Sequence, residues 1–328
     1  MSCLLCGSTE KEEVYLGRDR RYGLEGQFPL VRCQNCGFLF LSPRLTMEEM
    51  RAFYPYEDYY SEAIEGESSL LTRLDRFYGN KRICDVVISA RKGGRLLDVG
   101  CGTGIFLDMM RRRGEWEVFG VEINEEAARY ARGKLQLDVF AGELGEASFP
   151  TAHFDVVTLW HVLEHLHEPR LVLQEIYRIL RDDGWLLLSL PNAASYEAQA
   201  FGEFWAGLDV PRHLYFFTPT AIRELLRQEG FETVKLRTKS IMGAYRTLTL
   251  SLGFVVDEKV ASERWKALLN KLINAIPTRL LMAPCLRFLD FINRGSIMTV
   301  FARKVVGDKA ASSHKQSLRR VDDDRDRA

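Results

Sequence analysis

Long apolar segments are absent from this sequence of 328 residues. A helix that crosses a bilayer needs about 18 or more consecutive apolar residues, and the nearest candidate, TLTLSLGFVV at 247–256, is too short. The opening residues MSCLLCGSTEKEEV also lack the basic start and the apolar stretch of a secretory signal. These absences predict a cytoplasmic protein.

An excess of charge of either sign is missing too, because Lys and Arg together number 45 and Asp and Glu together number 45. A chain without net charge has no global field that would recruit nucleic acid or an anionic membrane. Arginines at positions 18, 20, 21 and 32 form only a modest basic cluster. We therefore expect a small molecule, rather than nucleic acid, as the partner.

A disulfide framework is not expected from seven cysteines, because this number is odd and fits a reducing compartment. Four thiolates are the ligand set of a structural zinc ion, and they leave no open position for catalysis. The sequence therefore predicts a zinc-ribbon-like module at residues 1–45, since a redox CxxC would not need a matching second pair. Its ligands are two CxxC pairs, each followed by glycine: Cys3, Cys6, Cys33 and Cys36.

Residues 46–91 are aromatic and acidic and are expected to form a helical linker that packs on the rest of the chain. Its tyrosines either pack in this way or line a substrate entrance. They are Tyr54, Tyr56, Tyr59 and Tyr60.

Short apolar runs alternate with helical patterns from about residue 92, and this alternation predicts an α/β fold with a parallel sheet and helices on both faces. Amphipathic helices are expected at IFLDMMRRRG, NEEAARYARGKL and PRLVLQEIYRILRDDG. Ligands of such sheets bind at the carboxyl ends of the strands. Five strands are expected, at 94–100, 117–123, 137–143, 154–160 and 184–191.

The first of these strands ends in DVGCGTG at 98–104, where three glycines allow a sharp turn and the close approach of a ligand. A dinucleotide fingerprint would need glycine at position 105, where Ile105 stands. The second strand ends in Glu122, which is well placed to accept both hydroxyls of a ribose. The pattern predicts an adenosine cofactor without distinguishing one kind from another.

The segment LWHVLEHLHEP at 159–169 contains His161, Glu164 and His165 in the HxxEH spacing of inverted zinc peptidases. Peptidases carry this motif in a long helix, whereas here it follows an expected strand and precedes Pro169. The peptidase interpretation is therefore rejected. Glu164 and His165 either orient a loop at the cofactor site by hydrogen bonds or face the substrate.

Five segments in fixed order resemble those of the class I S-adenosylmethionine-dependent methyltransferases: LLDVGCGTG, VEIN, AGELGEASFPTAHFDVV, HVLEHLHEP and LRDDGWLLLSLPN. The segment at 204–231 is similar to one branch of that family, and zinc-headed enzymes with this layout resemble those that methylate sugars or other metabolites. The resemblance implies a Rossmann-like sheet of seven strands, six parallel and one reversed, whose last two strands lie at 231–238 and 296–304. The methyltransferase domain would span 92–306, with a helical insertion at 241–295.

The resemblance also implies which residues contact the cofactor, S-adenosylmethionine. The glycine loop and the aspartate at its base would hold the methionyl part, and the glutamate after the second strand would bind the ribose. Residues after the third strand would contact the adenine, and those after the fourth would lie beside the sulfonium. The implied set is Asp98, Gly100, Cys101, Gly102, Gly104, Glu122, Ile123, Glu143, Leu144, Trp160 and His161.

Methyl transfer asks the protein to align an acceptor and, for a hydroxyl or a carbon acid, to remove a proton, a role that suits neutral histidine. His165 follows the fourth expected strand, and His213 follows the fifth in DVPRHLYFF. Both are candidate bases. His213 is preferred, because its segment also supplies Trp205 and Tyr215 for a pocket that accepts a sugar or an aromatic ring.

The insertion at 241–295 carries leucines at helical spacing with lysines and arginines between them. It is interpreted first as a cap over the substrate pocket or a homodimer contact. The alternative is loose membrane contact through 257–294, which would suit a lipid-linked acceptor. The tail at 307–328 lacks apolar periodicity and is expected to be disordered.

Three function classes remain. The first is methylation of oxygen or carbon in a small molecule such as a sugar, a glycan or a related metabolite. The second is an RNA methyltransferase that uses the zinc module to bind its substrate, which the even charge balance disfavours. The third is a non-catalytic cofactor-binding scaffold, which the intact DVGCGTG and HVLEH segments disfavour.

Overall fold

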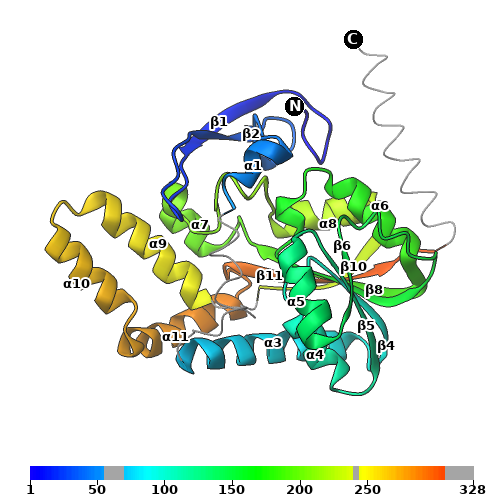
Figure 1. Ribbon diagram of the computed structural model, residues 1–328. Coiled ribbons are helices and arrows are strands. Elements are labelled where there is room, and N and C mark those ends of the chain that lie inside the picture. The colour runs from blue at the N-terminus through cyan, green and yellow to red at the C-terminus, as the bar shows by residue number, and fades with distance from the viewer. Residues whose placement is uncertain (55–69, 239–243, 307–328) are drawn as a thin grey trace, which may run out of the picture.

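Two sheets organise the chain in the computed structural model, which describes residues 1–54, 70–238 and 244–306 (Figure 1). The tail at 307–328, the first residues of the insertion at 241–243, and Tyr56, Tyr59 and Tyr60 lie outside the described residues. The strands of the larger sheet are β4 (Gly94–Val99), β5 (Trp116–Glu122), β6 (Asp138–Ala141), β7 (Phe154–Trp160), β8 (Leu180–Pro191), β10 (Phe231–Arg237) and β11 (Ile297–Lys304).

The larger sheet has the strand order β10-β11-β8-β7-β4-β5-β6. Strand β11 pairs antiparallel with both β10 and β8, while β8, β7, β4, β5 and β6 pair in parallel. Six strands therefore run one way and one is reversed, which confirms the predicted Rossmann-like sheet. The five strands expected from apolar runs each fall within a few residues of the observed bounds.

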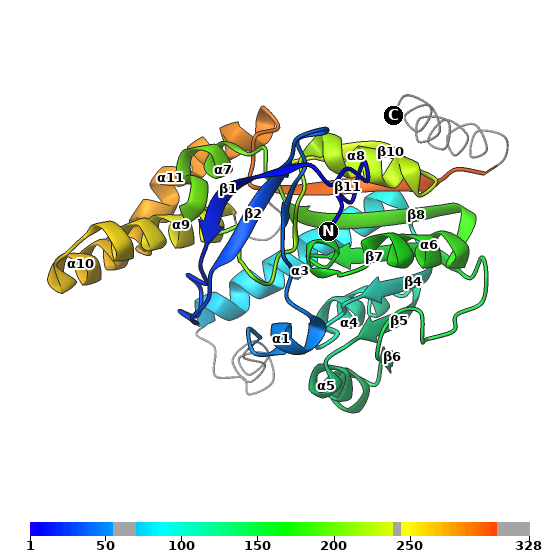
Figure 2. The same cartoon turned by 90° about the horizontal axis from the view of Figure 1, so that it is seen from above.

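Helices cover both faces of this sheet. Helices α3, α4 and α5 lie on one face, and α6 and α8 lie on the other (Figures 1 and 2). Successive strand residues point to opposite faces, so Leu96 and Val156 enter the core under α3 and α4, while Leu97 and Val157 enter the core under α6 and α8. The helix bounds are α3 (Leu70–Ala90), α4 (Ile105–Arg111), α5 (Glu125–Leu135), α6 (Pro169–Ile179) and α8 (Pro219–Gln228).

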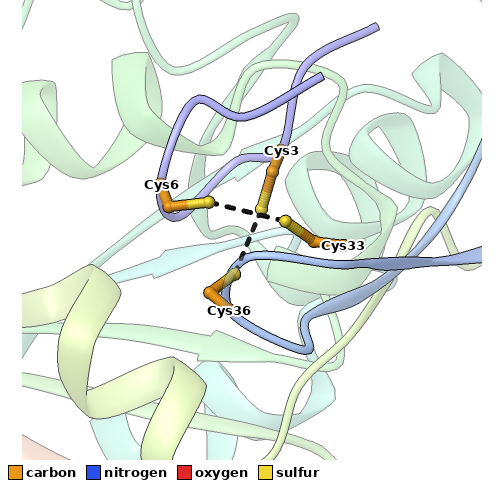
Figure 3. A group of neighbouring side chains, drawn as sticks. All are labelled: Cys3, Cys6, Cys33 and Cys36. Atoms are coloured by element: carbon orange, nitrogen blue, oxygen red, sulfur yellow. Dashed lines mark hydrogen bonds between the residues drawn. The ribbon is translucent and has the colours of Figure 1, made fainter. Parts of the chain in front are cut away.

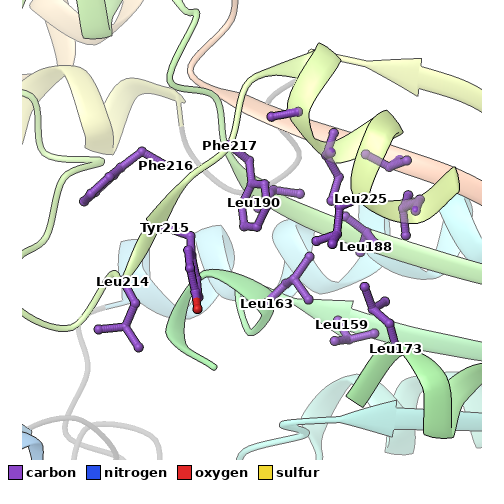
Figure 4. Packing of buried hydrophobic residues seen from close by; sticks show 14 of the residues in the cluster. Leu159, Leu163, Leu173, Leu188, Leu190, Leu214, Tyr215, Phe216, Phe217 and Leu225 are labelled. Atoms are coloured by element: carbon purple, nitrogen blue, oxygen red, sulfur yellow. The ribbon is translucent and has the colours of Figure 1, made fainter. Parts of the chain in front are cut away.

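The core under α6 and α8 contains leucines of the sheet that pack against leucines of these two helices. Figure 4 shows Leu159 and Leu188 of the sheet meeting Leu173 of α6 and Leu225 of α8. These four side chains have no exposed surface, and full burial of a leucine contributes about 1.5–3 kcal/mol. This packing fixes the strand ends from which the site is built.

The smaller sheet joins the N-terminal residues to the rest of the chain. Strands β1 (Lys11–Gly17), β2 (Phe28–Cys33) and β3 (Leu39–Leu41) pair antiparallel in that order. Its fourth strand is β9 (Tyr215–Phe216), which pairs with β3 through Leu39 and Phe40. The N-terminal sheet is therefore completed by residues from the far half of the sequence. Helix α1 (Met47–Arg51) follows, with a capping box between Thr46 and Glu49.

The insertion between β10 and β11 is helical, as the sequence predicts. Helices α9 (Ala244–Lys259), α10 (Glu263–Ile273) and α11 (Ile276–Phe291) pack on one another and project away from the large sheet (Figures 1 and 2). Arg20 of the N-terminal segment forms ion pairs with Glu258 of α9 and with Glu203, which anchors the base of this projection. Among the described helices, none combines the length and the apolar character needed to cross a membrane.

Candidate functional site

The sequence-predicted ligand residues gather at the carboxyl edge of the large sheet. The strands β4, β5 and β6 follow one another toward one edge of the sheet, and the next strand, β7, lies on the other side of β4. Ligands of open α/β sheets bind in the crevice at such a switch point in the strand order. The glycine loop follows β4, Glu122 ends β5, and Trp160 ends β7. Three segments that are distant in sequence therefore meet at one edge.

The loop after β4 takes backbone conformations that favour glycine. Gly100, Gly102 and Gly104 have φ angles of 73°, 55° and 76°, in the left-handed region that other residues rarely adopt. A Cβ at Gly100 would lie 2.6 Å from Cγ2 of Val162, so the loop also needs glycine for close contact with the segment after β7. Gly104 is the N-cap of α4, and because glycine has no side chain it cannot accept a hydrogen bond from the first turn of this helix.

Cys101 points away from the loop into the core. Its Sγ would lie 2.6 Å from a Cβ built on Gly120, and burial raises the pKa of this thiol well above its usual value. The backbone N–H groups of Gly100 and Cys101 donate to the carbonyl of Val121 at 2.7 and 3.1 Å. Cys101 therefore shapes the loop by packing, and its thiol is not placed for chemistry.

Glu122 is buried and holds two turns of the site together. One carboxylate oxygen accepts the N–H of Gly102 at 2.7 Å and the other accepts the N–H of Asn124 at 2.9 Å. The carboxylate accepts at both of its oxygens, so these bonds fix its direction at the edge of the sheet. The next residue, Ile123, is 58% exposed and offers an apolar surface beside the carboxylate.

Asp98 lies buried at the base of the glycine loop, where Thr158 donates to its Oδ1 at 2.6 Å. Burial raises the pKa of Asp98 to about 8, and the negative charge of Glu122 acts in the same direction. A cationic group bound beside the two carboxyl groups would lower the pKa of Asp98 again and favour its ionised form. The base of the loop is therefore suited to the positively charged part of a ligand.

Beyond β6 and β7, the predicted contact residues differ in exposure. Glu143 is exposed, and its N–H donates to the carboxylate of Glu146, whereas Leu144 is buried in the core. Trp160 meets Phe106 edge to face, with ring centroids 6.0 Å apart. The indole N–H of Trp160 is buried and has no hydrogen-bond acceptor among the residues that the structure describes.

The HxxEH residues do not lie on one long helix. Strand β7 ends at Trp160, His161 has a φ of 57°, and Glu164 and His165 lie in the single turn η1 (Leu163–His165). His161 contacts Glu164 through Nδ1 at 3.2 Å. Burial opposes ionisation of Glu164, but the hydrogen bond from His161 and the charges of neighbouring histidines lower the pKa of this carboxyl. The geometry of an inverted zinc peptidase is therefore not present.

His165 and His213 are brought together although 48 positions separate them in sequence. Their rings meet edge to face with centroids 4.6 Å apart. Nδ1 of His165 lies 2.9 Å from the Tyr54 hydroxyl and 3.1 Å from the carbonyl of Arg212. Burial, together with the charge of His213, lowers the pKa of His165 to about 4. His165 is therefore neutral near pH 7.

A buried ion-pair network that was not predicted from the sequence supports this histidine pair. Arg212 is only 1% exposed, and its guanidinium contacts Asp19 at 2.7 Å and Asp209 at 2.8 Å. Asp209 also lies 3.9 Å from Nε2 of His213. The sequence does contain a signal for this network. Asp209 and Arg212 stand next to His213 in an otherwise apolar segment, and charged side chains in apolar surroundings need partners of opposite charge.

Replacing Asp19 by alanine should lower the free energy of unfolding by about 3–5 kcal/mol, because it leaves Arg212 with part of its buried charge uncompensated. Chemical denaturation of the purified protein measures this loss. The matched control is Glu12→Ala, which breaks an exposed pair with Arg32 and should change the free energy by about 1 kcal/mol or less. Equal losses in the two variants would contradict the structural role of the buried pair.

Trp205 and Tyr215, the aromatic residues expected near His213, are both largely buried. Tyr215 belongs to β9, is 5% exposed, and its hydroxyl contacts Arg44 and the carbonyl of His167. Trp205 is 3% exposed and packs in the same core. Pairing between β3 and β9 accounts for the burial of Tyr215, and the part of both residues in an aromatic pocket stays a prediction.

The four cysteines of the two CxxC pairs converge at the N-terminal end of the small sheet, as Figure 3 shows. The Sγ atoms of Cys3 and Cys36, and those of Cys6 and Cys33, lie 3.5 Å apart. Four sulfurs bound at about 2.3 Å to one zinc ion lie roughly 3.8 Å apart. The donor set and its spacing therefore fit zinc.

The two turns that present these thiols are nearly identical. The N–H of Gly7 donates to the carbonyl of Cys3 at 3.0 Å, and the N–H of Gly37 donates to that of Cys33 at 2.8 Å. Both glycines have a φ of 74°. The glycine after each CxxC pair therefore supplies the left-handed conformation that its turn adopts.

Comparisons with known proteins agree with the geometry of this edge. Residues 74–236 match the family described as the methyltransferase domain. The ubiquinone biosynthesis O-methyltransferase of Thiobacillus denitrificans is 33% identical over 157 residues, which cover 44% of this chain and 67% of that protein. The malonyl-(acyl-carrier protein) O-methyltransferase of Serratia marcescens is 32% identical over 153 residues, which cover 46% of this chain and 59% of that protein.

Among solved structures, the (4+2)-cyclase SpnF superimposes with a TM-score of 0.51 and 18% sequence identity, covering 81% of this chain and 99% of that one. At this identity the likeness concerns the fold alone. The matches to the two O-methyltransferases cover less than half of this chain. The acceptors named for those relatives are properties of those proteins.

Proposed function

Because this chain belongs to the class I S-adenosylmethionine-dependent methyltransferases, we propose that it transfers a methyl group to an oxygen atom of a small-molecule acceptor. Two relatives that are O-methyltransferases support the choice of oxygen over carbon. Within this class we propose a sugar, a glycan precursor or a related biosynthetic metabolite as the acceptor. The zinc-headed layout of the sequence supports this narrower choice.

The residues at the carboxyl edge suit the cofactor, which supplies an electrophilic methyl group on a positively charged sulfur when bound. Glu122 would accept the ribose hydroxyls, because its carboxylate is already oriented by two backbone N–H groups. Asp98 would attract the cationic methionyl end from its buried position at the base of the loop. Exposed Ile123 offers its apolar surface to the adenine.

The observation that carries the proposal is the contact between His165 and His213. His165 stands three residues after Val162, which lies against Gly100 of the glycine loop. An acceptor hydroxyl must lose its proton as the methyl group arrives, and an imidazole that is neutral near pH 7 can take it. We assign His213 as the proton acceptor, because Asp209, at 3.9 Å from its Nε2, would stabilise the imidazolium that forms. His165 would orient the acceptor from the opposite side of the pair.

We propose in addition that Cys3, Cys6, Cys33 and Cys36 hold one structural zinc ion. Four thiolates fill the coordination sphere of the ion, so it would stabilise the N-terminal module without taking part in the reaction.

His213→Ala should lower kcat by about two to four orders of magnitude, because the proton then has no positioned acceptor. Cofactor affinity should persist, since the contacts proposed for the cofactor come from β4 and β5. The measurement is transfer of a labelled methyl group to nucleotide sugars, lipid extracts and RNA, followed by kinetics on the acceptor that is found.

The matched control for this variant is His153→Ala, which removes a histidine at the start of β7, at the opposite end of the strand. It should leave kcat unchanged. Full turnover in His213→Ala would remove the assignment of this residue, and methyl transfer to RNA alone would contradict the small-molecule acceptor.

A further inference from the structure

Helices α10 and α11 of the insertion expose apolar side chains in regular stripes. On α11, six apolar residues recur at intervals of three and four positions, and all of them are exposed. Residues at this spacing lie on one face of a helix. Leu281, Phe288 and Phe291 are 77%, 60% and 82% exposed, so their apolar surface faces solvent almost fully. The α11 stripe comprises Leu281, Pro284, Cys285, Phe288, Phe291 and Ile292.

Helix α10 carries a shorter stripe of the same kind. Trp265, Leu268 and Leu272 follow one another at intervals of three and four positions, and all are exposed. Arg264 and Lys271 lie on the same side of this helix, because they stand four positions before and three positions after Leu268. Exposed apolar residues are common singly, whereas a contiguous exposed apolar surface marks an interaction site.

The opposite faces of both helices are used for packing within the insertion. The amide of Asn270 donates to the carboxylate of Asp257 at 3.0 Å, and the hydroxyl of Tyr245 donates to the carbonyl of Ile273. On α11, Leu286 is half-buried on the side away from the stripe. The stripes are therefore the faces that remain after the three helices have packed together. They lie on a projection that points away from the large sheet (Figures 1 and 2).

The charge of these two helices indicates the kind of partner. Residues 264–294 contain six lysines and arginines and one acidic residue, in a chain whose net charge is zero. The acidic residue, Asp290, is half-buried, whereas Arg264, Lys271 and Arg287 are exposed. Exposed tryptophan, phenylalanine and leucine beside lysine and arginine are typical of helices that lie in the interface of an anionic bilayer.

We propose that α10 and α11 bind the surface of a bilayer that contains anionic phospholipids. The two stripes would insert among the acyl chains, and the exposed basic residues would lie at the lipid phosphates. An interfacial helix buries its apolar face by about 5–10 Å, a depth that phenylalanine and leucine side chains reach. Each lysine or arginine near an anionic surface raises the affinity by about fivefold. This binding does not depend on methyl transfer.

A second copy of the chain is the alternative occupant of the α11 stripe. Two copies that packed stripe against stripe would bring together two surfaces with the same excess of basic charge, and like charges across an interface oppose association. Phospholipid headgroups of negative charge have the opposite effect, because they attract the arginines and lysines beside the stripes. The charge complementarity therefore favours the bilayer over a second copy.

Flotation of the full-length protein with lipid vesicles tests this binding. The protein should bind vesicles of phosphatidylcholine and phosphatidylglycerol, and it should bind vesicles of phosphatidylcholine alone at least about tenfold more weakly. Leu281→Ser should lower the affinity for the anionic vesicles by about tenfold, because it removes a large apolar side chain from the stripe. Arg287→Glu should lower it by at least about fivefold, because it replaces attraction by repulsion.

The chain offers a matched control for each of these variants. Leu171→Ser removes an exposed leucine from α6, and Arg129→Glu reverses the charge of an exposed arginine on α5. Both controls should bind the anionic vesicles as the unaltered protein does. All four substituted side chains are exposed, so each variant should fold, and circular dichroism verifies this.

Absence of binding to anionic vesicles, or equal binding to the two kinds of vesicle, would overturn the anionic bilayer as the partner. Equal losses in the variants and in their controls would overturn the assignment to α11. Light scattering of the protein without lipid supplies a further check. A dimer that Leu281→Ser converts to a monomer would assign the stripe to a second copy and overturn the proposed binding to the bilayer.

Discussion

Cys33→Ser is expected to yield protein that lacks zinc and whose N-terminal module is unfolded. Structural zinc contributes about 10–16 kcal/mol of apparent binding free energy in small zinc-binding units, which is as large as the whole free energy of about 5–15 kcal/mol that separates a folded domain from its unfolded state. Cys33 is 1% exposed and belongs to the core that the module shares with the large domain. Serine offers no comparable ligand.

The loss should extend beyond the module because of how the module is docked. Arg170 of α6 donates to the carbonyl of Leu4 at 2.6 Å, and Gln228 of α8 donates to that of Leu5 at 3.1 Å. Both acceptors lie within the first CxxC turn. Unfolding of the module would also remove Asp19 from Arg212, so the support of His213 would weaken and methyl transfer should fall with the zinc content.

Elemental analysis and thermal unfolding measure these effects. The control is Cys285→Ser, which replaces an exposed cysteine on α11 and should retain about one zinc ion per chain and the unaltered melting temperature. A Cys33→Ser protein that still holds one zinc ion per chain would contradict the four-cysteine site.

Glu122→Ala should reduce the affinity for S-adenosylmethionine by at least about 100-fold. A hydrogen bond to a charged acceptor contributes about 1.5–3 kcal/mol, and two ribose hydroxyls would lose such a bond, with each 1.4 kcal/mol equal to a factor of ten. The substitution also removes the acceptor of the Gly102 N–H, so the glycine loop loses one of its anchors. Isothermal titration calorimetry with the cofactor measures the change.

Glu126→Ala is the matched control, because it removes an exposed carboxylate from the first turn of α5, four residues from Glu122. Its affinity for the cofactor should match that of the unaltered protein. Unchanged affinity in a folded Glu122→Ala variant would remove the ribose assignment and with it the main cofactor contact of β5.

The parts of the fold that could be predicted from the sequence are those encoded by short local patterns. The run LLDV before three alternating glycines specifies a buried strand and a left-handed loop, and each CxxC with its glycine specifies one turn. Such signals depend on residues within one element, so they need no knowledge of distant partners. Strand β11 was also predicted correctly, because the resemblance to the methyltransferases implied a reversed strand at 296–304, close to the observed Ile297–Lys304.

What escaped prediction depends on contacts between distant segments. The pairing of β3 with β9 and the ion pair of Asp19 with Arg212 join parts of the chain that no periodicity connects. His165 and His213 were recognised as separate candidates, but their contact arises only because η1 and the segment before β9 are joined through Leu214 and Glu164. Tyr215 illustrates the same limit, since its burial follows from that strand pairing.

Strand β9 has a consequence for the order in which this protein can form. Asp19 and Arg212 lie 193 residues apart, and the small sheet needs Tyr215 and Phe216 to be complete. During synthesis the first three strands therefore leave the ribosome long before their fourth partner exists. Contacts at such separation are slow to close, so the zinc-binding turns would have to hold β2 and β3 in register until the rest of the chain arrives. Completion of the small sheet and pairing of Asp19 with Arg212 would then have to follow the synthesis of residues 212–216.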